Sequence, residues 1–313
     1  MIALGHGCCF LFHRAARSPA WAGLPNRGFY LDVEYLDRLI RHVQRTGWDI
    51  VTLDEALGRT REGHGRRFIN FSLDDCYRDT AEVVVPLFRR LGAPITLFVT
   101  TGIPDETLRL FYAGLETIIQ REEQIIDDDD RFDITSPAQK RAAFAAIVRR
   151  WDEAGDHAAS YVRFCVRHGY DADALDAQHR ITWPMLEAMR ADPLVEFGGH
   201  TVSHPHVAAL DRGQATAELT GCRARLEAAL DQPILHFAFP YGQPSDCGPR
   251  DFELARAAGF HTAATTSAGL LRRGTDPFRL PRNTINGEHR ALPYAYAHLT
   301  GLSGLAHKVL RRV

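Results

Sequence analysis

The sequence predicts an α/β protein in which parallel strands alternate with helices. Short apolar runs with the length of buried strands recur along the chain, and amphipathic stretches separate them. One strand begins at Phe68 and ends in the pair Asp74-Asp75, and another, at 194–197, leads into Gly-Gly-His. Because parallel strands place their carboxyl ends at one rim of the sheet, we expect the polar residues after them to meet there.

The alternation holds through two parts of the chain. In the first part, strands are predicted at 8–12, 48–51, 68–75 and 94–100, and helices at 33–46, from Thr52 as cap to 57, and at 81–91, with a Pro/Gly-rich loop at 18–28. In the second part, helices are predicted at 183–190, 214–230 and 252–258, and strands at 194–197, 234–239, 262–266 and 280–282.

Residues from about 102 to 180 interrupt this rhythm. The pattern there is mostly helical, at 108–122, 137–151 and 158–168. The run of four aspartates at 127–130 lacks the glycine and the twelfth-position glutamate of a calcium loop, so we expect a solvated linker. The sequence therefore predicts a single domain over 1–313, with a helical insertion at about 102–180 beside the barrel mouth.

The composition narrows the class of protein. With 313 residues, 45% hydrophobic and 24% charged residues and a net charge of −2, the chain resembles an ordinary soluble protein and offers no basic surface for nucleic acid. We expect no membrane-spanning segment, since the apolar stretch at 1–12 is too short and lacks a secretory leader. Six cysteines without a CxxC spacing favour a reducing compartment, so a cytoplasmic location is expected.

The two polar strand ends suggest a metal centre. His200 and His204 are four residues apart and share one face if their segment is helical. Two histidines and one carboxylate form a three-ligand site that leaves a position for water, as catalytic divalent metals require. Adjacent residues on extended backbone point to opposite sides. One aspartate of the Asp74-Asp75 pair can therefore bind a metal while the other accepts a proton.

These motifs resemble those of the polysaccharide deacetylases with the NodB homology domain, carbohydrate esterase family 4. The family's (T/S)-F-D-D motif is similar to Ser72-Leu73-Asp74-Asp75, and its H-(S/T)-x-x-H motif matches residues 200–204 at every position. Its R-x-P-Y motif is matched in part at 238–241. The resemblance covers about 8–101 and 181–283. It is closest to the bacterial exopolysaccharide and chitooligosaccharide branch, because of Phe-Ser-Leu-Asp-Asp and the Thr-Thr-x-x-Gly string at 265–269.

The resemblance implies a distorted (β/α) barrel and a set of roles. Asp75, His200 and His204 would hold a divalent metal, most simply zinc, and Asp74 would be the general base. The backbone N–H of Tyr241 would stabilise the oxyanion, and Pro240 and Tyr241 would contact the substrate. The implied substrate is an oligo- or polysaccharide whose N-acetylglucosamine units lose acetate.

Two family positions differ in this chain. Ala238 replaces the arginine that braces the base, and Leu280-Pro281-Arg282 stands where the family has Leu-x-His with its general acid. Arg282 is our candidate for the missing positive neighbour of Asp74. His13 is our candidate acid, because poly-N-acetylglucosamine deacetylases have a similar histidine after an apolar strand near the N-terminus. His206 and His289 are poorer candidates for the acid.

Three readings of the function stay open from the sequence. The first is a metal-dependent carbohydrate de-N-acetylase. The second is a related amidohydrolase or O-acetyl esterase with the same metal site. The third is a carbohydrate-binding relative that keeps the metal without turnover. Cys76, where relatives commonly have glycine, is not expected to be a nucleophile because no base is paired with it. The oligomeric state is left open.

Overall fold

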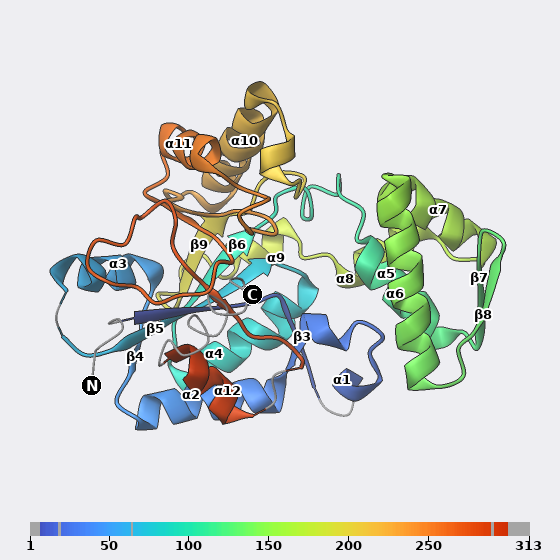
Figure 1. The fold of residues 1–313 in the computed structure, drawn as a ribbon, viewed down its shortest axis with the longest axis horizontal. Coiled ribbons are helices and arrows are strands. Elements are labelled where there is room, and N and C mark those ends of the chain that lie inside the picture. Colours follow the sequence, from blue (N-terminus) through green and yellow to red (C-terminus); the bar gives the residue numbers. More distant parts are fainter. Residues whose placement is uncertain (1–6, 18–19, 64, 289–290, 300–313) are drawn as a thin grey trace, which may run out of the picture.

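The fold is a curled, mostly parallel sheet with helices around it, as predicted (Figure 1). The computed structural model describes residues 7–17, 20–63, 65–288 and 291–299. The strands of the main sheet are β1 (Gly7–Phe12), β4 (Asp49–Ile50), β5 (Phe68–Asp75), β6 (Ile95–Val99), β9 (Val195–Gly199), β10 (His236–Ala238), β11 (Thr262–Ala264) and β12 (Asn283–Thr284).

Burial explains the apolar character of these strands. All eight residues of β5 are buried, since helices cover one face of the sheet and the curl encloses the other. The surrounding helices are α2 (Val33–Arg45), α3 (Leu53–Glu62), α4 (Val85–Leu91), α9 (Trp183–Glu187), α10 (Arg212–Leu230), α11 (Pro249–Ala257) and α12 (Leu292–Leu299), with a π-helical turn at Thr80–Val84 before α4.

The residues 280–284 join the two edges of the sheet. Leu280 forms a parallel bridge to Ala264 in β11, and β12 pairs with β1. The strand order is β11-β10-β9-β6-β5-β1-β12. This one segment therefore bonds to β11 at one end of the order and, as β12, to β1 at the other end. The strand predicted at 280–282 is therefore displaced, because the regular ladder begins at Asn283. Arg282 lies between the two bonding sites.

The insertion between β6 and β9 has its own hydrophobic core. It contains α5 (Phe111–Arg121), β7 (Gln124–Asp127), β8 (Asp130–Asp133), α6 (Pro137–Ala154), α7 (His157–Arg167) and α8 (Ala172–His179). Its buried residues, from Leu115 to Leu175, form a cluster separate from that of the barrel. In Figure 1 this segment is the green lobe at the right, beside the strand-bearing part of the molecule.

The aspartate run at 127–130 is not a solvated linker, contrary to the prediction. It forms the turn of the β7–β8 hairpin, in which Asp127 and Asp130 are paired. Asp127 is buried and accepts hydrogen bonds from Arg150 and from Trp151 Nε1. A buried carboxylate is tolerated when such donors satisfy it. These donors lie on α6, more than twenty residues further along the chain.

The described part of the predicted loop, residues 20–28, contains more regular structure than expected. It contains α1 (Ala20–Gly23) and leads into a 3₁₀ turn (Arg27–Phe29). The flanking residues form a small parallel sheet of β2 (Arg14–Ala16) and β3 (Tyr30–Asp32).

No helix in the described ranges is both long and apolar enough to cross a bilayer. All six cysteines are free and buried.

A charged cluster at the amino-terminal end of the strands fixes α3 to the barrel. Glu196 accepts hydrogen bonds from the N–H groups of Leu53 and Asp54 at the start of α3. His236 Nε2 lies 3.3 Å from a carboxylate oxygen of both Asp54 and Glu196, and its Nδ1 contacts Thr262. Burial alone would lower the pKa of His236, but the two carboxylates raise it to about 9. The cluster is therefore an imidazolium between two carboxylates.

This cluster makes stability depend on pH. Since the pKa of His236 is about 9 in the folded protein and 6.5 in a model peptide, its stabilisation is complete below pH 6.5 and is lost as the pH rises through 9. We expect the free energy of unfolding of the wild type to fall by roughly 2–3 kcal/mol over this range relative to His236→Gln. Urea unfolding at pH 6 and pH 9.5 measures this. Exposed His261→Gln serves as control, and an equal fall in all three proteins would contradict the assignment.

Candidate active site

Asp74 and Asp75 end β5, but they do not point to opposite sides as extended backbone would require, since a carboxylate oxygen of each lies near His200 Nε2, at 3.8 Å for Asp74 and 3.5 Å for Asp75. The side chains of Asn70, Ser72 and Asp74 face the barrel interior, where each has polar partners. Asp75 has a φ of 71°, and the N–H of Cys76 donates to the carbonyl of Asp74 at 2.9 Å, which closes a three-residue turn. Cys76 also has a positive φ, of 66°. This explains why a glycine would suit its position.

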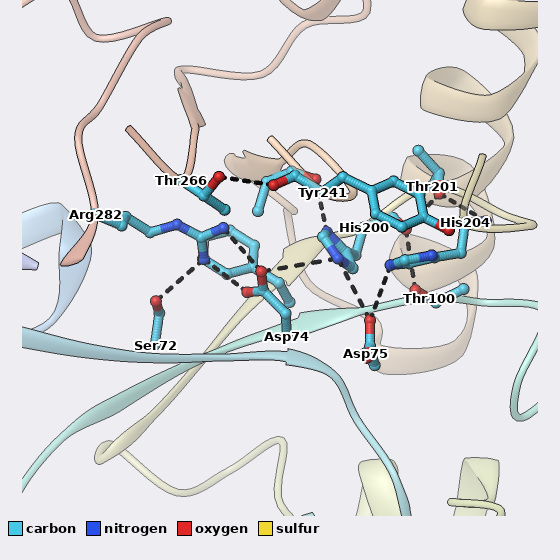
Figure 2. A network of polar contacts seen from close by, with 12 residues as sticks. Ser72, Asp74, Asp75, Thr100, His200, Thr201, His204, Tyr241, Thr266 and Arg282 are labelled. Carbon is cyan, nitrogen blue, oxygen red and sulfur yellow. Dashed lines mark hydrogen bonds and ion pairs between the residues drawn. The ribbon is translucent and has the colours of Figure 1, made fainter. Parts of the chain in front are cut away.

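His200 and His204 lie on a tight loop after β9, so the helical arrangement considered for their spacing is not the one present. Thr201 and His204 have φ values of 65° and 59°, which no helix contains. The Thr201 hydroxyl accepts a hydrogen bond from the His204 N–H, and the Glu218 carboxylate accepts from Val202 and Ser203. These bonds curl the loop so that both imidazoles turn to the same side (Figure 2).

The two histidines converge on Asp75. In the sheet, Asp75 is in register with Val99 of β6, and Val99 with Gly199 of β9, so His200 follows directly beside the aspartate. Asp75 Oδ1 lies 3.2 Å from His204 Nε2 and 3.5 Å from His200 Nε2. Four ligands about 2.1 Å from a tetrahedral ion are about 3.4 Å apart, so this spacing suits one ion.

The donor atoms themselves fit a divalent metal. Asp75 Oδ1 is buried and accepts no hydrogen bond of good geometry. His200 Nδ1 lies 2.7 Å from the Ala238 carbonyl, which can only accept, so Nδ1 carries the proton and Nε2 offers its lone pair. Burial lowers the pKa of His200 to about 4, which keeps the imidazole neutral. Burial would lower the pKa of His204, but the Asp75 carboxylate raises it, so a bound ion would take the place of a proton between these two groups. A carboxylate oxygen and imidazole nitrogens are donors that zinc prefers.

Arg282 lies beside Asp74. Its two terminal nitrogens donate to the two Asp74 oxygens at 2.6 and 2.8 Å, while its remaining donors reach Ser72 and the Thr265 carbonyl. Both side chains are almost fully buried. Burial would raise the pKa of Asp74, but the charge of Arg282 outweighs it and holds the pKa below its ordinary value. Asp74 is therefore ionised, and its second oxygen lies 3.8 Å from His200 Nε2.

The residues after β10 form a second strained turn at the site. Tyr241 has a φ of 59°, and the Gly242 N–H donates to the Pro240 carbonyl at 2.6 Å. The Tyr241 ring lies 5.0 Å from that of His204. Among the described residues, no acceptor contacts the Tyr241 N–H. Pro240 is buried within this turn, and its contact with substrate stays a prediction.

His13 follows directly after β1, within electrostatic range of the two aspartates. Its charge is among the influences that lower the pKa of both Asp74 and Asp75, although burial acts in the opposite direction. The imidazole stacks on the ring of Phe29 at 4.5 Å. His206 stacks on Tyr241 and pairs with Asp246, outside the metal ligands. His289 lies outside the described residues.

Several residues of the site were missed in the sequence. Glu218 holds the histidine loop, Ser72 and Thr265 hold Arg282, and Phe29 carries His13. No motif marks Glu218 or Phe29, and the motifs that contain Ser72 and Thr265 do not reveal that these residues bind Arg282, because each acts through a contact between distant segments. Cys76 is buried and burial raises the pKa of its thiol well above the usual range, which agrees with its exclusion as a nucleophile.

Comparison with known proteins agrees with this geometry. A family model described as polysaccharide deacetylase matches residues 61–263, more than half of the chain. Among curated proteins, none matches the sequence.

Several solved structures share the fold. IcaB from Ammonifex degensii is 15% identical, with 94% of this chain and 97% of that chain covered and a TM-score of 0.60. The deacetylase PplD of Streptococcus pyogenes in complex with acetate is 15% identical, with 90% and 92% covered and a TM-score of 0.59. BC0361, a polysaccharide deacetylase from Bacillus cereus, is 11% identical, with 93% and 68% covered and a TM-score of 0.61.

At these identities the structural likeness shows the fold, and the family model shows the membership. Strands β5, β6, β9 and β10, the aspartate pair and the histidine loop lie within the matched region. The chain therefore belongs to the polysaccharide deacetylase family, whose members are hydrolases that de-N-acetylate carbohydrates.

Proposed function

We propose that this protein is a metal-dependent deacetylase that removes acetate from N-acetylglucosamine units of an oligo- or polysaccharide, with chitooligosaccharides and exopolysaccharides as the substrate class. The observation that carries the proposal is the convergence of His200 and His204 on a buried Asp75 oxygen that has no other partner. Asp74, ionised and fixed, lies directly beside them.

Asp75, His200 and His204 would hold the ion. A bound divalent metal, most simply zinc, supplies a Lewis acid that polarises the acetamide carbonyl and makes water acidic. The protein contributes the arrangement of these ligands. The Ala238 carbonyl accepts a hydrogen bond from His200 Nδ1, and the Thr201 hydroxyl accepts one from the His204 N–H, and these bonds orient the two histidines.

Asp74 is the proposed general base. Its Oδ2 is the oxygen that faces His200 Nε2, so it is placed to take a proton from the attacking water. Arg282 holds the carboxylate in one orientation by two parallel hydrogen bonds. Arg282 would therefore brace the base, which is the role of the family arginine that Ala238 replaces here.

Tyr241 and His13 are proposed for the remaining two roles. The unused N–H of Tyr241, in a turn beside His204, suits the oxyanion that develops on the carbonyl. His13, at the end of β1 and within electrostatic range of both aspartates, would donate the proton that the departing amine needs.

Separate loss of the base and of a ligand tests these assignments. We expect Asp74→Asn to lower acetate release from chitin oligosaccharides by about 10³-fold while metal content stays at one ion per chain, because Asp74 is not a ligand. His204→Ala should lose both the metal and the activity. Acetate assays and elemental mass spectrometry measure the two quantities. Loss of metal from Asp74→Asn would overturn the division of roles.

The chemical class of substrate is tested with the same assay. We expect the wild type to release a free amine together with acetate, and O-acetylated sugars to be poorer substrates. Acetate without amine would identify an esterase. Bound metal without acetate from any glycan would identify a binding protein.

Removal of Arg282 tests the buried ion pair. Arg282→Met leaves a buried carboxylate without its partner, so we expect the free energy of unfolding to fall by about 3 kcal/mol or more. The double variant Asp74→Asn/Arg282→Met should recover part of this loss and remain inactive. Arg59→Met, which removes a more exposed ion pair, should change stability by less than about 1 kcal/mol. Equal losses for the single and double variants would argue against the pair.

A further inference from the structure

The ring of Tyr241 packs on a histidine that the proposed reaction does not use. His206 lies two residues after the ligand His204, and its imidazole stacks face to face on the Tyr241 ring. The two centroids are 3.7 Å apart and the planes differ by only 5°. Tyr241 also meets His204 edge to face, at 5.0 Å (Figure 2). The ring of Tyr241 is therefore in contact with two histidines of one loop, although 45% of the residue stays exposed.

Asp246 holds His206 in place from the loop after β10. Its Oδ1 lies 3.1 Å from His206 Nδ1, and only 10% of the Asp246 side chain is exposed. Its Oδ2 accepts a hydrogen bond from the Gln243 N–H at 2.9 Å, and its backbone carbonyl accepts one from the Ala208 N–H at 3.0 Å. Asp246 therefore ties the loop that carries the metal histidines to the turn that contains Tyr241.

Tyr241 needs such support because its backbone is strained. A φ of 59° places this bulky residue in the left-handed region, which costs free energy and persists only where the surroundings impose it. The Thr266 hydroxyl donates to the Tyr241 carbonyl at 2.7 Å, which restrains one side of the residue (Figure 2). The stack on His206 acts on the ring instead, and stacked rings stabilise each other beyond their burial.

We propose that His206 is a positioning residue, which acts through the ring of Tyr241 and is itself oriented by Asp246. The proposal rests on the proposed function, in which the Tyr241 N–H stabilises the oxyanion. Because the ring and the N–H belong to one residue, fixing the ring restrains rotation about φ and keeps the N–H in one direction. A donor that is already aimed stabilises the transition state without reorganising first. In this role His206 touches none of the reacting groups.

His206→Ala tests this in the metal-loaded enzyme. We expect kcat for a chitin tetramer to fall about tenfold and KM to stay within about twofold, because the oxyanion contact exists only in the transition state. Elemental mass spectrometry should still find one ion per chain, since His206 is not a ligand. His206→Phe returns a ring to the same place and should keep kcat within about threefold of the wild type.

A double variant separates positioning from direct catalysis. If His206 acts only through the ring, Tyr241→Ala should lower kcat by a similar factor, and adding His206→Ala to it should cause little further loss. Losses that multiply in the double variant would show that the imidazole takes part in the reaction itself, and the proposal fails. It also fails if His206→Phe is as slow as His206→Ala, or if His206→Ala keeps the wild-type kcat.

His42→Ala is the matched control. His42 is a half-buried histidine whose ring also meets a tyrosine, Tyr296, at 5.2 Å. It lies in the last turn of α2, just before β4, and β4 begins beside the first residue of β5, at the end of the sheet opposite the catalytic rim. We expect this variant to keep kcat and KM. An equal loss of kcat in His42→Ala and His206→Ala would make the effect structural and contradict the proposal.

Failure of the proposed function would look different, since the wild type would then release no acetate from any glycan. The support of Tyr241 is measured independently by ¹⁵N relaxation of its amide in protein labelled with ¹⁵N-tyrosine, with the signal assigned from its absence in Tyr241→Phe. We expect an order parameter of about 0.85 in the wild type and in His206→Phe, and a fall toward about 0.6 in His206→Ala. Equal order parameters in all three proteins would overturn the inference.

Discussion

The buried pair of Arg282 and Asp74 is the interaction on which this site depends. Arg282 lies in the segment that joins the two edges of the sheet, and Asp74 lies at the end of the central strand β5. A buried charge is costly unless it is paired and fully hydrogen-bonded. Here each of the three guanidinium nitrogens donates to at least one acceptor, in Asp74, Ser72 or the Thr265 carbonyl. The same Arg282–Asp74 pair therefore holds the two edges of the sheet together and orients the proposed base.

Backbone strain is concentrated around the same rim. Five of the eight non-glycine residues with positive φ in the described ranges belong to the site: Asp75, Cys76, Thr201, His204 and Tyr241. Such conformations cost on the order of 1–3 kcal/mol each and persist where the surroundings impose them. The parallel ladder of β5, β6 and β9 fixes the starting points of these turns. The strained turns direct the side chains of Asp75, His200 and His204, and the N–H of Tyr241, toward the proposed metal site.

The two ends of the barrel use charge differently. At the carboxyl end, the charges surround one unpartnered oxygen, Asp75 Oδ1, which suits a ligand. At the amino end, Glu196 has its hydrogen-bonding capacity filled by the start of α3, Thr96 and His236, and this suits structural support. The insertion adds a third charged contact, through Glu116 and Tyr30, which connects its separate core to the catalytic rim.

The sequence by itself determined the parallel α/β fold, the insertion and the three metal-ligand candidates. Those properties follow from local patterns: apolar runs of strand length, helical periodicity, and polar residues directly after strands. The tertiary structure decided that residues 200–204 form a strained loop and that Asp127 is buried, and it confirmed the pairing of Arg282 with Asp74, which the sequence offered only as a hypothesis. Each of these rests on contacts between segments far apart in the chain, such as Glu218 with Val202 and Ser203, or Arg150 with Asp127. The free energy that stabilises such conformations comes from distant partners, so no local pattern of residues contains it.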